Sequence, residues 1–86
     1  MTLMRAEGWL VASVSDEILM LNIARGEYVG LNETGAVIWE LLETPQTIEH
    51  LVASLVAQFE VDASQATAEV NAFIEQAMQK GMVQQL

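Results

Sequence analysis

The sequence predicts an α+β domain with a winged-helix-like fold, in which a three-stranded antiparallel sheet is followed by three helices. Short apolar segments rich in β-branched residues fill the chain before residue 32, which is typical of strands. Longer segments after that point carry apolar residues at helical spacing. Because strands are segregated from helices, the order β-β-β-α-α-α indicates an α+β architecture. Residues 1–86 are expected to form one domain, since a second core would be too small.

Three strands with short connections are expected to form an antiparallel meander, over residues 9–14, 17–23 and 27–31. Ser15 and Asp16 bound the first strand. Arg25 and Gly26 stand where a tight hairpin turn would join the last two strands, because glycine accepts a positive φ. Residues 1–8 are expected to be a flexible lead-in.

The helices are expected over residues 33–43, 48–59 and 62–80, with N-caps at Asn32, Thr47 and Asp62. Pro45 ends the first helix, since proline disfavours helical backbone at the residue before it. Gly81 is a natural residue to follow the third helix. The tail over 82–86 is expected either to form a short strand or to fray.

Composition and charge exclude several classes of partner. The formal net charge is −9, from twelve carboxylates and three cations, so phosphate backbones and anionic membranes would be repelled. A basic peptide or protein would be attracted. No cysteine is present, no apolar run is long enough to span a bilayer, and no secretory signal is visible. We therefore expect a cytoplasmic protein, with a monomer favoured.

Catalytic equipment is not apparent in the sequence, and we expect neither an enzyme, a metal site nor a cofactor. His50 is the only histidine, and one imidazole without thiolates makes a poor zinc site. Ser54 lies four residues from His50, but nothing supplies an oxyanion hole. DNA binding fails as well, because Lys80 is the only cation between residues 47 and 80, whereas tight binders make roughly six to ten phosphate contacts.

An interaction module is the class that remains. An open three-stranded meander has two edge strands, and the segment 27–31 is one candidate. An exposed edge beside an apolar helix is the geometry for β-augmentation, in which a bound peptide adds a strand. The alternative, that strand 27–31 is covered or central, stays open. A second hypothesis is a regulatory or structural domain that binds a partner protein through the apolar helix faces, above all residues 48–59.

The residue pattern also resembles a known family. It comprises Tyr28-Val-Gly-Leu-Asn32, then Thr34-Gly35, Ile38-Trp39, Leu41-Leu42, Thr47-Ile48 with Leu51, and a terminal Gly81-Met82-Val83. This pattern resembles the PqqD-like proteins, the stand-alone peptide chaperones also called RiPP precursor peptide recognition elements. The resemblance covers essentially the whole chain, and it rests on loose, mostly structural motifs.

The resemblance implies a function that composition and spacing do not give. Such domains bind the leader segment of a ribosomally synthesised precursor peptide and deliver it to a maturation enzyme, such as a leader peptidase or a radical enzyme. The leader lies antiparallel along the third strand, in a cleft against the third helix. The implied leader-binding residues are Glu27, Tyr28, Val29, Gly30, Leu31, Glu69, Val70, Phe73, Ile74 and Ala77. Lasso-peptide and other modified-peptide pathways are favoured slightly over the PQQ pathway.

Overall fold

In a computed structural model, which describes residues 1–15 and 17–86, three helices accompany two small antiparallel sheets. The helices are α1 (Glu33–Leu41), α2 (Ile48–Phe59) and α3 (Ala63–Gln79). One sheet is the predicted meander, formed by β2 (Leu10–Val14), β3 (Glu17–Asn22) and β4 (Glu27–Leu31). The other has the order β5-β1-β6, formed by Gln46–Thr47, Thr2–Arg5 and Val83–Gln85. The predicted α+β class is confirmed, and the second sheet is an addition to it.

The helices begin where the capping residues predict. The Asn32 Oδ1 atom accepts a hydrogen bond of 2.8 Å from the backbone N–H of Gly35, and Asp62 Oδ1 accepts one of 2.7 Å from Gln65. Thr47 caps α2 in the same way. Each cap satisfies an N–H that has no partner inside its helix, so the element boundaries are encoded locally.

Two glycines make the turns that the sequence assigns to them. Gly26 has a φ of 68° in the turn between β3 and β4, and Gly81 has a φ of 71° directly after α3. Both values lie in the left-handed region that glycine enters without steric cost. Asp16, predicted to bound the first strand, lies outside the described residues.

The predicted flexible lead-in is wrong, because residues 2–5 form the central strand β1 of the second sheet. Thr2 and Leu3 pair with β5, and residues 3–5 pair with β6. The Leu3 side chain is fully buried among the core residues. Arg5 lies over the ring of Trp39, 4.7 Å from its centroid. Strand β1 therefore ties the α1–α2 connection to the C-terminal tail, which forms a short strand.

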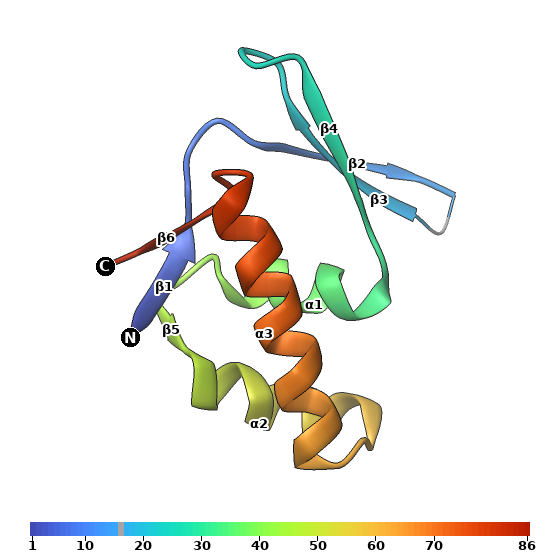
Figure 1. The fold of residues 1–86 in the computed structure, drawn as a ribbon. Coiled ribbons are helices and arrows are strands. Elements are labelled where there is room, and N and C mark those ends of the chain that lie inside the picture. The colour runs from blue at the N-terminus through green and yellow to red at the C-terminus, as the bar shows by residue number, and fades with distance from the viewer. Residues whose placement is uncertain (16) are drawn as a thin grey trace.

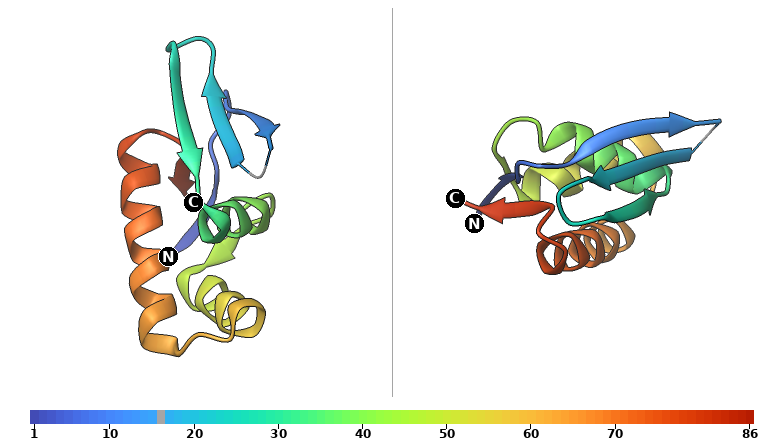
Figure 2. Two further views of the ribbon diagram at one scale, coloured as in Figure 1. Left: turned by 90° about the vertical axis from the view of Figure 1, so that its right-hand side faces the viewer. Right: turned by 90° about the horizontal axis from the view of Figure 1, so that it is seen from above.

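The two sheets lie at different places around the helices (Figure 1). The sheet β5-β1-β6 brings the two termini together beside the helices, while the meander stands beyond one end of them. The two views of Figure 2 agree that β4 is the strand of the meander nearest α3. In the part of the chain that the structure describes, no helix is long and apolar enough to cross a membrane.

Side chains of the meander hold it against the C-terminal end of α3. The indole N–H of Trp9 donates to the carbonyl oxygen of Gly81 at 3.1 Å, and Arg25 Nη1 donates to that of Lys80 at 2.8 Å. Arg25 also pairs with Glu27 at 3.2 Å. Trp9 directly precedes β2 and Arg25 lies in the β3–β4 turn, so two separate segments hold the meander at the end of α3.

Candidate functional site

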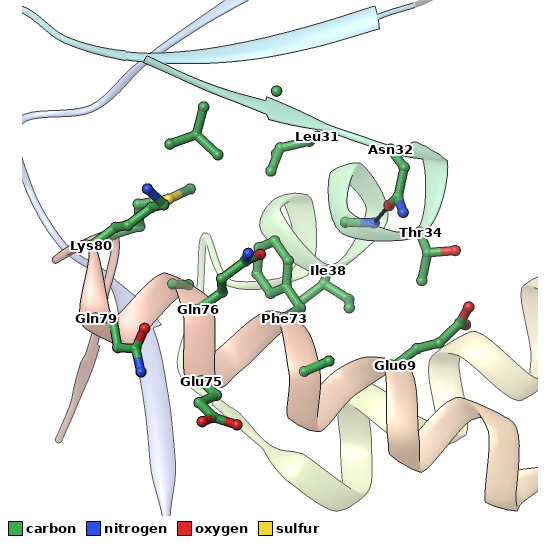
Figure 3. A pocket seen from close by; sticks show the side chains of 16 residues that line it. Leu31, Asn32, Thr34, Ile38, Glu69, Phe73, Glu75, Gln76, Gln79 and Lys80 are labelled. Carbon is green, nitrogen blue, oxygen red and sulfur yellow. Dashed lines mark hydrogen bonds between the residues drawn. The ribbon is translucent and has the colours of Figure 1, made fainter. Parts of the chain in front are cut away.

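A cavity of about 460 Å³ opens between β4, the start of α1 and the length of α3. Its walls combine aliphatic and aromatic side chains with amides and a few charges (Figure 3). The lining residues are Val29, Gly30, Leu31, Asn32, Thr34, Gly35, Ile38, Glu69, Ala72, Phe73, Glu75, Gln76, Ala77, Gln79, Lys80 and Met82. We call this cavity the β4–α3 cleft.

Strand β4 forms one wall of the cleft and is an edge strand. It pairs with β3 on one side, and among the described residues no strand pairs with its other side. The register with β3 is continuous through Gly30, opposite Leu19, so Gly30 marks no bulge. The open side of β4 therefore offers unpaired backbone N–H and C=O groups next to the cleft.

Successive side chains of β4 point to opposite faces of the sheet. Val29 and Leu31 are half-buried and line the cleft. Tyr28 lies on the other face and is 74% exposed. Glu27 and Tyr28 line a smaller neighbouring hollow near the β3–β4 turn, together with Arg25 and Lys80. Of the five predicted β4 positions, the structure thus places Val29, Gly30 and Leu31 at the cleft itself.

Helix α3 forms the opposite wall and separates its predicted residues into two groups. Glu69, Phe73 and Ala77 line the cleft. Val70 and Ile74 are 0% and 4% exposed, belong to the hydrophobic core and do not line the cleft. Ala77 is 2% exposed and belongs to both groups, since it is a core residue at the wall of the cleft. The apolar stripe of α3 contains both groups, and only packing shows that it is divided between the core and the cleft.

The start of α1 closes one end of the cleft, which sequence reasoning did not foresee. Asn32, Thr34, Gly35 and Ile38 all line it. A Cβ atom at Gly35 would lie 3.3 Å from the ring of Phe73 and 3.2 Å from Asn32 Oδ1. Gly35 therefore leaves room for the aromatic ring to lie against α1. The signal available in the sequence was the cap itself, since it directly follows β4.

Further residues of α3 that line the cleft, most of them polar, were also missed. Ala72, Gln76 and Lys80 follow Glu69 at spacings that continue one face of a helix. Their mixed polarity hides this stripe from a search for apolar periodicity. Gln76 lies beside Phe73 in the middle of the cleft (Figure 3).

The apolar face of α2 is used inside the molecule. Leu51 and Leu55 are fully buried, and the other apolar residues of its stripe pack against the core. His50 lies at the start of α2, where its Nδ1 atom contacts the side-chain oxygen of Gln46. Neither the stripe nor the histidine borders the cleft.

Comparisons with known proteins give a consistent family and fold. The family model described as coenzyme PQQ synthesis protein D (PqqD) matches residues 17–83. The structure of TbiB1 in complex with the TbiA(beta) leader peptide has a TM-score of 0.82 and 25% identity, covering 96% of each chain. A lasso peptide synthetase B1 complexed with its leader peptide has a TM-score of 0.82 and 23% identity, covering 96% of this chain and 98% of that chain. Among curated proteins, none matches the sequence significantly. Because the family model spans most of the sequence, the chain belongs to the PqqD family.

Proposed function

We propose that this protein binds the leader segment of a ribosomally synthesised precursor peptide as an added strand on β4. The observation that carries the proposal is the open edge of β4, with which no strand of residues 1–15 and 17–86 pairs, beside the partly apolar β4–α3 cleft. In β-augmentation, main-chain hydrogen bonds supply affinity and pockets for alternate side chains supply specificity. The cleft between β4 and α3 provides both elements.

The comparisons support the same class of ligand. Two structures of the same fold were solved with leader peptides bound, and one of them is a lasso peptide synthetase B1. The family to which the chain belongs is named for coenzyme PQQ synthesis. By this proposal the protein is a non-catalytic carrier that delivers the precursor to a maturation enzyme. A leader peptidase or a radical enzyme is the class of partner that would receive the bound precursor.

The energetics favour a few apolar anchors in the cleft. Ordering a flexible leader costs about 2–5 kcal/mol, which the contacts must exceed. Burying one Leu- or Phe-sized side chain contributes about 1.5–3 kcal/mol. Two apolar anchors of the peptide, packed among the half-buried Val29, Leu31 and Phe73, therefore offset the ordering cost, and the strand hydrogen bonds fix the register.

A titration followed by NMR tests the proposal. The labelled protein is titrated with synthetic leader segments of ribosomal precursor peptides, and with scrambled versions of the same sequences. We expect saturable chemical-shift changes concentrated on residues 26–32 and 69–80 for the leaders alone. Changes confined to residues 48–59 would instead support a domain that binds partners through α2. Leaders that bind no better than their scrambled versions would contradict the proposed function.

Gly35→Ala is expected to weaken leader binding while leaving stability nearly unchanged. The new methyl group meets the Phe73 ring at 3.3 Å and the Asn32 Oδ1 atom at 3.2 Å, and Phe73 lines the cleft. Displacement of the ring into the cleft should reduce affinity about tenfold. Replacing glycine by alanine in a helix contributes up to about 1 kcal/mol, which offsets the crowding. Fluorescence anisotropy with a labelled leader and urea unfolding measure the two effects. Ala68→Ser, on the exposed part of α3, is the control and should alter neither.

A further inference from the structure

Charge is distributed unequally along the β4–α3 cleft. Lys80 lies at the end beside the start of β4, and Glu69 lies at the end beside Thr34 (Figure 3). The residues between them are mostly apolar or amide, including Leu31, Phe73 and Gln76. A second carboxylate, Glu75, lies between the two ends of the cleft, and its side chain points away from β4 (Figure 3). The cleft therefore has a basic end and an acidic end on the same helix.

The basic end is built from two of the three cations in the chain. Lys80 and Arg25 both line the hollow that extends the cleft toward the β3–β4 turn. Arg25 is already engaged, since it pairs with Glu27 and donates to the carbonyl oxygen of Lys80. Among residues 1–15 and 17–86, no carboxylate lies within ion-pair distance of the Lys80 ammonium group. Lys80 is also half-buried, so its charge is less screened than that of a fully exposed lysine.

The spacing of the two charges matches an added strand. Lys80 follows Glu69 by eleven residues, which corresponds to about 16 Å along a helix. A strand advances about 3.3 Å per residue, so about five residues of a bound peptide span the same distance. The screening length at physiological salt is about 8 Å, so a peptide charge at one end is governed by the nearer cleft residue.

We propose that the cleft selects peptides by charge polarity, with a carboxylate beside Lys80 and a basic side chain beside Glu69. This inference rests on the proposed function and adds a specificity rule to it. All strands of the meander pair antiparallel, and antiparallel pairing is slightly the more stable. An antiparallel peptide on β4 carries its basic residue toward the N-terminal side and its acidic residue about five positions later.

The rule adds a local charge preference to the overall charge of the protein. With a net charge of −9, the protein as a whole attracts basic peptides and repels acidic ones. Lys80 creates a local exception at one end of the cleft, because Arg25 beside it is neutralised by Glu27. Peptides that carry both charges in the stated order form a favourable charge pair at each end of the cleft. Peptides with the reverse order place a like charge at each end and bind more weakly.

Selection from a displayed library of random peptides tests the rule. The wild-type protein and the charge-swapped variant Lys80→Glu/Glu69→Lys are used as separate baits. The swap leaves the net charge unchanged, so any difference between the two pools reports where the charges lie. We expect the wild-type pool to be enriched in a basic residue followed, about five positions later, by an acidic one. The swapped variant should enrich the opposite order.

Affinity measurements on single peptides show how strongly the charge order affects binding. A synthetic peptide from the wild-type pool should bind the swapped variant at least about tenfold more weakly, because two exposed pairs change from attraction to repulsion. Exchanging the two charged residues within that peptide should restore the affinity for the variant. Pools without a charge order, or with the same order for both baits, would overturn the proposal.

The Gly35→Ala variant separates failure of the charge rule from failure of the proposed function. Selected peptides that bind this variant as tightly as the wild type do not occupy the cleft, and both proposals then fail. Selected peptides that bind Gly35→Ala more weakly yet ignore the charge swap leave the proposed function standing. The charge rule alone is then overturned.

Discussion

At one of the two positions 28 and 29, proline is expected to weaken peptide binding strongly without unfolding the protein. In an antiparallel ladder, alternate residues turn their backbone N–H toward one neighbour and then toward the other. One of Tyr28 and Val29 therefore presents its N–H to the open side of β4. Proline there removes that donor and places its ring in the path of the added strand. We expect affinity for a leader peptide to fall at least about a hundredfold, or about 2.7 kcal/mol.

The two proline variants are compared with each other and with alanine variants at the same positions. The other proline removes a donor to β3 and should lower the stability of the sheet, which circular dichroism and thermal unfolding detect. Tyr28→Ala and Val29→Ala keep the backbone N–H and report the contribution of each side chain. If both proline variants fold and bind as tightly as the wild type, strand addition on β4 is wrong.

The opposite edge of the sheet provides a matched control. The register aligns Val11 with Met20 and Val29, so the direction of hydrogen bonding alternates across the three strands. If the N–H of Tyr28 faces the open side of β4, that of Val11 faces the open side of β2. Val11→Pro is then the control for Tyr28→Pro, and Ala12→Pro is the control for Val29→Pro. A proline on the free side of β2 should leave peptide binding intact.

Leu3→Ala is expected to destabilise the protein by about 2–5 kcal/mol, as truncation of a buried leucine does. Leu3 is 0% exposed and sits in the central strand of the β5-β1-β6 sheet. Small domains are stable by only about 5–15 kcal/mol, so this single change removes a large share of the total. Urea unfolding, followed by circular dichroism, measures the change in the free energy of unfolding.

Leu86→Ala is the matched control, because it removes the same side-chain atoms from a leucine that is 63% exposed. This substitution should change the free energy of unfolding by no more than about 0.5 kcal/mol. A Leu3 variant as stable as the Leu86 variant would mean that strand β1 contributes little to the fold. The N-terminal segment would then be the flexible lead-in that its sequence suggests.

Local signals account for the success of the predicted meander and helices. The caps at Asn32, Thr47 and Asp62 satisfy the first N–H groups of their helices with side chains three residues away or fewer. Turns at Gly26 and Gly81 need only the freedom of glycine to adopt a positive φ. Such interactions depend on neighbours in the chain, so a single sequence reveals them.

Strand β1 was missed because nothing local specifies it. Its four residues gain their hydrogen bonds from Gln46 and Thr47 on one side and from residues 83–85 on the other. Both partners are distant in the chain and too short to show a strand pattern of their own. Only the packed helices bring them together, so this sheet depends on the tertiary fold.

The sequence by itself determined the α+β class, the order of the main strands and helices, the caps and the acidic character of the protein. It also indicated that β4 and α3 face one another, through resemblance to the family. Only the tertiary structure decided which residues of the apolar α3 stripe are available to contact a bound peptide. Val70, Ile74 and Ala77 are buried in the core, whereas Phe73 is only half-buried and lines the cleft. The physical reason is that apolar periodicity shows which face of a helix is buried, but it does not show what that face packs against. The cleft forms only when the sheet packs on the helices.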